Sequence, residues 1–165
     1  MSPAARAKLA QAKARLDTLD LYARPVRMRR VRLLSVPWLF RLPWFRRFDG
    51  YTMWDLILVR RPVAECGDDL VTHELCHVWQ MQHHPIAMPL SYLYRGYRDN
   101  PNEVQARRAT EATRFGLCNS CRHQRLVRSG RGSVFTMCLR SKTDPAFPKY
   151  PRVPVLECSG HERRS

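Results

Sequence analysis

The stretch 70–82 reads LVTHELCHVWQMQ and places two histidines, His73 and His77, four residues apart, with Glu74 beside the first. Residues four apart in an α-helix lie on the same face, so both imidazoles can reach one metal ion while Glu74 projects beside them. The preceding residues 67–69 (GDD) supply a turn and an N-cap. The stretch therefore predicts a helix that presents two histidines and a carboxylate to one site.

The pattern H-E-x-x-H is typical of hydrolytic zinc sites. Catalytic zinc takes neutral histidine nitrogens at about 2.0–2.1 Å and keeps one of its four positions open for water. Glu74 would then take a proton from that water. A short pattern also arises by chance, and the three side chains could simply form a polar helix face. An apolar stripe with helical spacing, which would anchor the helix, favours a real site: Leu70, Val71, Leu75, Val78 and Trp79.

A third ligand has to come from elsewhere in the chain, and Glu103 is the best candidate. Asn100 as N-cap and Pro101 at the first helical position predict a second helix that runs to about Phe115. Glu103 lies three residues after the cap. It is therefore either a metal ligand or the side chain of a capping box.

The combination of HELxHxxQ with NPxExxA resembles the zincin metallopeptidases, in particular small bacterial ones whose third ligand is a glutamate on a following helix. The resemblance covers about residues 51–114. It implies that three residues bind a catalytic zinc and that Glu74 is the general base; the implied ligands are His73, His77 and Glu103. Arg107 departs from the pattern, because some of these peptidases carry an aspartate there that orients a histidine. The outer-shell partners are therefore left unassigned.

Two more features would complete a peptidase site. Residues 51–59 (YTMWDLILV) predict a strand, and the resemblance implies that this strand lies beside the substrate peptide. A hydrolase also needs a donor for the oxyanion, and Tyr92, Tyr94 and Tyr97 are candidates; each could equally be a core residue with its hydroxyl at the surface.

The first fifty residues are basic and partly aromatic. Residues 2–20 predict an amphipathic helix with Ser2 as N-cap and Pro3 at its first position. Residues 26–48 interleave arginines with aromatic side chains, and Pro37 and Pro43 limit them to short strands or turns. They either pack under the active-site helix or face a membrane or nucleic acid.

The net charge of +15 is unevenly distributed. Residues 1–50 hold 12 basic and 3 acidic side chains, residues 51–115 hold 7 and 8, and residues 116–165 hold 10 and 3. The basic ends predict either a partner such as nucleic acid or another polyanion, or a merely soluble surface. The chain shows no signal peptide and no transmembrane segment, so we expect a cytoplasmic protein.

The region after Gly116 has too few apolar residues for an ordinary core, so a bound metal or disulfide bonds would be needed to stabilise it. Four cysteines can act as ligands for such a metal: Cys118, Cys121, Cys138 and Cys158. Zinc is the expected second metal, an iron–sulfur cluster or a redox CxxC being the alternatives. Cys158 opens a C-x-x-H, so His161 is an alternative ligand to Cys138.

The expected fold is therefore α+β. Residues 1–115 would form a minimal zincin-like domain with an active-site helix and a substrate-edge strand, and residues 116–165 a small metal-stapled module. The expected function is zinc-dependent hydrolysis of a peptide or protein substrate. The alternative is a noncatalytic metal-binding adaptor that contacts nucleic acid or a protein partner, although structural zinc has no use for Glu74.

Overall fold

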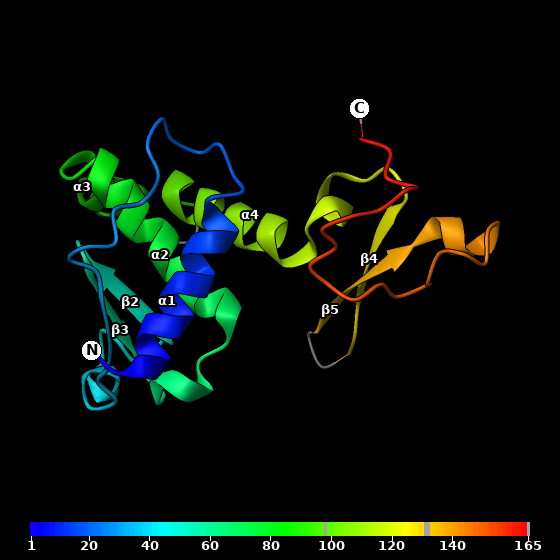
Figure 1. Ribbon diagram of the computed structural model, residues 1–165. Coiled ribbons are helices and arrows are strands. Elements are labelled where there is room, and N and C mark those ends of the chain that lie inside the picture. The colour runs from blue at the N-terminus through cyan, green and yellow to red at the C-terminus, as the bar shows by residue number, and fades with distance from the viewer. Residues whose placement is uncertain (98, 131–132, 165) are drawn as a thin grey trace. The chain divides into compact units, whose positions relative to one another are not determined.

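The computed structural model describes residues 1–97, 99–130 and 133–164 (Figure 1). These residues form helices and small sheets, which confirms the predicted α+β class. The chain divides into two compact units, 1–110 and 111–165, a few residues before the boundary predicted at Gly116. Each helix among the described residues is too short or too polar to span a bilayer.

The first helix of unit 1, α1 (Pro3–Leu16), begins as its sequence predicts. The Ser2 hydroxyl caps it by accepting a hydrogen bond from the Ala5 amide at 3.2 Å. One face is buried through residues at helical spacing: Ala5, Leu9, Ala12 and Leu16. The helix is thus amphipathic as predicted, and it ends four residues before Asp20.

A three-stranded sheet lies beside the helices in the order β1-β3-β2. Its strands are β1 (Arg32–Ser35), β2 (Gly50–Met53) and β3 (Leu56–Val59). β1 runs parallel to β3, and β2 pairs with β3 in an antiparallel hairpin. The prediction of one strand over residues 51–59 is therefore wrong. The chain reverses at Trp54-Asp55, where Trp54 takes the left-handed conformation (φ 50°) that a tight hairpin turn demands.

Three more helices follow. They are α2 (Asp68–His83), α3 (Ala87–Arg95) and α4 (Pro101–Phe115). α2 begins after Gly67, and its first-turn Asp68 pairs with Lys8 of α1 at 2.7 Å. α4 begins at Pro101 and ends at Phe115, as predicted.

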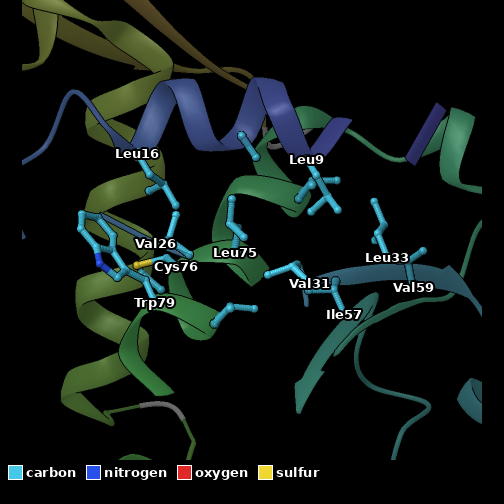
Figure 2. Close-up of a cluster of buried hydrophobic side chains, with 14 of the residues drawn as sticks. Leu9, Leu16, Val26, Val31, Leu33, Ile57, Val59, Leu75, Cys76 and Trp79 are labelled. Atoms are coloured by element: carbon cyan, nitrogen blue, oxygen red, sulfur yellow. The ribbon is translucent and has the colours of Figure 1, made fainter. Parts of the chain in front are cut away.

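The core of unit 1 lies where α1, α2 and the sheet meet (Figure 2). Leu9 and Leu16 of α1 pack against Leu75 and Trp79 of α2, and the apolar side chains of β1 and β3 continue the cluster. Trp79 also donates from its ring nitrogen to the Arg24 carbonyl at 2.7 Å. α2 is thus anchored through one face, while its other face is left for polar side chains.

Unit 2 is built from short elements. Its sheet is a hairpin of β4 (Gln124–Arg128) and β5 (Val134–Cys138), preceded by the 3-10 turn Leu117–Ser120. The C-terminal segment returns to this turn, because the Arg122 amide donates to the Glu162 carbonyl at 2.8 Å and the Arg164 amide to the Ser120 carbonyl at 2.7 Å.

Candidate metal centre

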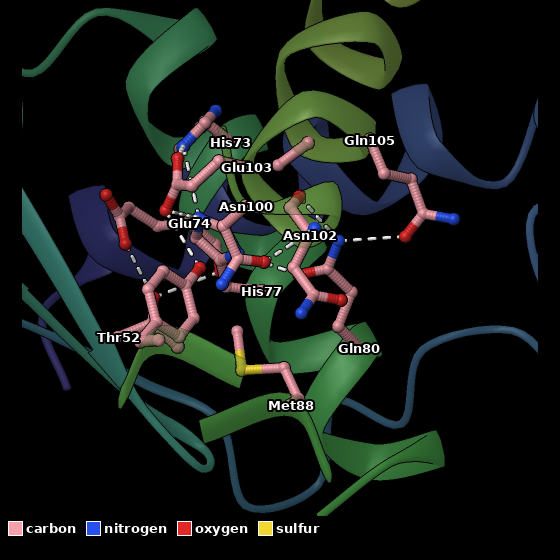
Figure 3. Close-up of polar contacts among 12 residues, drawn as sticks. Thr52, His73, Glu74, His77, Gln80, Met88, Asn100, Asn102, Glu103 and Gln105 are labelled. Carbon is pink, nitrogen blue, oxygen red and sulfur yellow. Dashed lines mark hydrogen bonds and ion pairs between the residues drawn. The ribbon is translucent and has the colours of Figure 1, made fainter. Parts of the chain in front are cut away.

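The predicted ligands meet at one point of unit 1. α2 carries His73 and His77 on one face, and their Nε2 atoms lie 3.1 Å apart. α4 brings Glu103 opposite them, with Oε2 3.4 Å from Nε2 of His73 and Oε1 3.2 Å from Nε2 of His77 (Figure 3). Among the described residues, this is the single group of three ligating side chains whose atoms all lie within 4.8 Å of one another.

These separations fit a metal ion. A tetrahedral zinc with ligands at about 2.0–2.1 Å holds its ligand atoms about 3.3–3.4 Å apart. The three observed distances, 3.1, 3.2 and 3.4 Å, lie close to that edge length. Two nitrogens and a carboxylate also form a donor set typical of a catalytic zinc.

Asn100 determines where Glu103 points. Its buried side chain accepts from the Asn102 amide at 2.9 Å and donates to the Ser91 hydroxyl at 2.9 Å, which ties the start of α4 to α3. The Asn100 amide itself donates to the Tyr97 carbonyl. The Glu103 carboxylate is therefore not used as a capping box and faces the histidines instead.

The charges of the group shift the pKa values of its members in opposite directions. Burial alone would raise the pKa of Glu103, but hydrogen bonds from His73 and His77 outweigh it, and the pKa lies well below its usual range. Burial alone would lower the pKa of His77, but Glu103 and Glu74 outweigh it and raise the pKa. Two carboxylates thus make this spot favourable for positive charge.

Glu74 lies next to this group and outside it. Its side chain is 5% exposed, and Oε2 accepts a hydrogen bond from the Thr52 hydroxyl of β2 at 2.7 Å. Burial raises the pKa of Glu74, partly offset by His77 and Thr52. The carboxylate needs a glycine opposite it, since a Cβ on Gly50 would lie 2.5 Å from Oε1 of Glu74. The Glu74 carboxylate is therefore held beside the group of three ligating side chains and not within it.

A cleft of about 460 Å³ opens over these groups. Glu74, His77 and Glu103 form its polar side, and the remaining lining is largely aromatic and aliphatic. Compared with known protein families, curated proteins and solved structures, the chain matches none of them. What the site can do therefore rests on its own geometry.

The strand β2 lines this cleft with a free edge. Within the described residues it pairs on one side only, with β3. The Arg60 amide donates to the Asp49 carbonyl, so these two residues form a hydrogen-bonded pair. Because hydrogen-bonded and non-hydrogen-bonded pairs alternate along an antiparallel ladder, Gly50 and Thr52 form non-hydrogen-bonded pairs with β3. The main-chain groups of Gly50 and Thr52 therefore point away from β3, toward a position that a peptide could occupy.

The three candidate tyrosines separate in the structure. Tyr92 donates to Oε1 of Glu103 at 2.9 Å, and Tyr97 lines the same cleft. Burial, followed by the charge of Glu103, raises the pKa of both phenols, which keeps them protonated as donors. Tyr94 is 84% exposed and lies outside the cleft lining. The prediction of Tyr94 as an oxyanion donor is therefore wrong, because its side chain lies in solvent outside the cleft.

Gln80 is a site residue to which the sequence alone assigned no role. It is fully buried, and its Nε2 donates to the Asn102 carbonyl at 2.9 Å and to Oε1 of Gln105 at 2.8 Å. Since a carbonyl can only accept, the amide oxygen must face Nδ1 of His77, 2.8 Å away. Nδ1 is then the donor, so a neutral His77 ring leaves the lone pair of Nε2 available to a metal ion. The signal in the sequence was the spacing of three residues from His77, one turn along the same face.

Replacing Gln80 with methionine should weaken zinc binding by about 10- to 100-fold, because the His77 tautomer is no longer fixed and a buried Nδ1 loses its partner. Competition against a chelator measures the affinity, and circular dichroism checks folding. Gln82→Met is the matched control, since Gln82 lies on the same helix but bonds to Arg27 and Asp55. Wild-type affinity in a folded Gln80→Met protein would show that Gln80 does not orient the ligand.

The four cysteines predicted to form a second site gather in unit 2. Burial raises the pKa of Cys118 to about 11, and the neighbouring thiols of Cys121, Cys138 and Cys158 add to the shift. All six cysteines are unpaired thiols. The sulfur atoms lie farther apart than the ligating atoms of His73, His77 and Glu103. Among the described residues, no three of these sulfur atoms all lie within 4.8 Å of one another. The His161 ring contacts the Ser120 hydroxyl at 3.2 Å.

Proposed function

We propose that residues 1–115 act as a zincin-type metallopeptidase that hydrolyses peptide bonds with a zinc ion held by His73, His77 and Glu103. The observation that carries the proposal is the convergence of three ligand atoms at tetrahedral separations beside a fourth residue, Glu74, that is kept out of the ligand set. The resemblance of HELxHxxQ and NPxExxA to those peptidases supports the same conclusion.

Each group in the cleft has a role in this reaction. When bound, zinc would polarise the scissile carbonyl and make water more acidic. Glu74 takes a proton from the attacking water and passes it to the leaving amine. Thr52 holds the Glu74 carboxylate in place by its 2.7 Å hydrogen bond. Tyr92 or Tyr97 donates to the developing oxyanion.

The substrate binds as an extended strand along β2. The main-chain groups of Gly50 and Thr52 would pair with the peptide backbone, a mode that reads little of the side-chain sequence. The peptide then crosses the cleft next to Glu74, which lies directly behind Gly50. A broad range of peptides is the expected substrate class.

Zinc-loaded protein should hydrolyse casein or a random peptide library, lose this activity on chelation, and regain it when zinc is returned. Mass spectrometry of the products gives the readout, and far-UV circular dichroism before and after chelation shows whether the fold persists. Zinc-loaded, folded protein that cleaves nothing in the library would contradict the proposal and favour the noncatalytic adaptor.

We also propose that unit 2 binds its own metal through Cys118, Cys121, Cys138 and Cys158. The proposal is supported by the proximity of the thiols, since Cys118, Cys138 and Cys158 line one cavity and the other three cysteines all raise the pKa of Cys118. A thiolate set of this kind favours zinc or an iron–sulfur cluster. The metal would serve as the staple for a unit with few buried apolar side chains.

Elemental analysis should therefore find about two metals per chain, because the two ligand sets differ in chemistry and share no residue. His77→Ala should remove one metal and Cys121→Ala the other, and absorbance in the visible range would distinguish a cluster from zinc. Cys66→Ala is the control, since Cys66 is a buried thiol of unit 1. A single metal that both variants abolish would contradict the two-site assignment.

A further inference from the structure

The helix α3 has an apolar face that none of the described residues of unit 1 covers. Its inner side packs through Met88, which is 3% exposed, and through Tyr92. The opposite side carries large apolar side chains in solvent at helical spacing, beginning with the N-cap residue: Ile86, Leu90 and Tyr94, with Leu93 at the edge toward the cleft. Leu93 is 77% exposed. A helix that is apolar on both faces normally buries both, so the outer face is built for contact.

A second segment with exposed apolar side chains reaches the same cleft through Trp44 and Phe45. Trp44 is 81% exposed and Trp38 is 65% exposed, and Leu42 lies between them in the chain. Trp44 and Leu93 line the same cleft from its two sides. We call these two segments, 38–47 and 86–97, the apolar rim of the cleft.

The charge on this rim has one sign. Neither segment contains an aspartate or a glutamate, and both carry exposed arginines: Arg41, Arg46, Arg47 and Arg95. The Arg47 guanidinium lies over the Tyr97 ring of the rim, 5.9 Å from its centroid, and over the adjacent Phe48 ring, 4.7 Å from its centroid, so its charge is held beside aromatic side chains. A partner that binds the apolar rim therefore has to offer an apolar interior to its large side chains and negative surface charge to its arginines.

We propose that the apolar rim docks on an anionic lipid surface, so that the cleft opens at the membrane. Tryptophan, tyrosine and leucine insert at the level of the headgroups, while arginines meet lipid phosphates. Nucleic acid fits less well, because Ile86, Leu90 and Leu93 are aliphatic and offer no ring for a base to stack on. A second copy of the chain fits less well too, since the arginines of two rims would face each other. Binding of the apolar rim to lipid does not require that the cleft hydrolyses peptides.

The test uses the full chain and sedimentation with vesicles of phosphatidylcholine, alone or mixed in equal parts with phosphatidylglycerol. The protein should bind the anionic vesicles, and binding should weaken as salt rises toward about 0.15 M. The double variant Leu93→Ser/Tyr94→Ser should bind at least roughly tenfold more weakly, because apolar area is lost with no change in charge. Circular dichroism checks that the variant is folded.

The matched control is Leu156→Ser/Tyr150→Ser, which removes the same two residue types from exposed positions of unit 2. It should bind the vesicles like the wild type. Equal losses in both variants would mean that the basic chain binds lipid without using the rim, which overturns the proposal. So would a wild type that ignores anionic vesicles. If the rim variant instead converts a dimer to a monomer in light scattering while vesicle binding is absent, the occupant is a second copy and lipid is wrong.

Discussion

Glu74→Gln should bind zinc as the wild type does and lose peptide hydrolysis by a factor on the order of 10² to 10⁴, the usual scale for losing a general base. Glutamine keeps the size of the side chain and can still accept the Thr52 hydrogen bond. It cannot take a proton from water. Because the Glu74 carboxylate lies outside the group of three ligand atoms, its loss should leave metal affinity unchanged.

The assay compares initial rates on casein or a peptide library at saturating zinc, with zinc affinity measured on the same preparations. Glu65→Gln serves as the control, because Glu65 is an exposed acid just before α2 and lies away from the cleft. A Glu74→Gln protein that cleaves as fast as the wild type would mean that another group is the base and that the proposed peptidase mechanism is wrong.

Among these variants, Glu103→Ala should cause the largest loss of zinc affinity. Its carboxylate contacts both histidines, at 3.2 and 3.4 Å, and is the single anion of the ligand set. The loss of zinc affinity should exceed the 10- to 100-fold that removal of an outer-shell partner costs. Hydrolysis at limiting zinc should fall with it.

Chelator competition gives the affinity, and zinc stoichiometry after dialysis gives an independent reading. Glu111→Ala is the matched control, since Glu111 is an exposed glutamate on the same helix. Unchanged zinc affinity in folded Glu103→Ala would show that Glu103 is no ligand and that its place beside the histidines reflects an ion pair in the metal-free protein.

The elements whose ends carry strong local signals were predicted well. Pro101 after a capping Asn100 located α4 to the residue, and Ser2 with Pro3 located the start of α1. The hairpin of β2 and β3 was missed because its turn, Trp54-Asp55, lacks the glycine or asparagine that normally takes the left-handed conformation. α3 was also missed, because it begins close after Pro85 and contains Pro89 in its first turn.

The sequence by itself determined that His73, Glu74 and His77 share a helix, since a spacing of four residues fixes their common face wherever that helix packs. It could not decide whether Glu103 caps its own helix or binds metal, because both roles have the same local pattern. Only the tertiary structure showed that Glu103 faces the histidines of α2 rather than its own helix start, where Asn100 bonds to α3 instead. The same holds for Gln80, whose amide orientation depends on the Asn102 carbonyl, a contact between residues 22 apart in the chain.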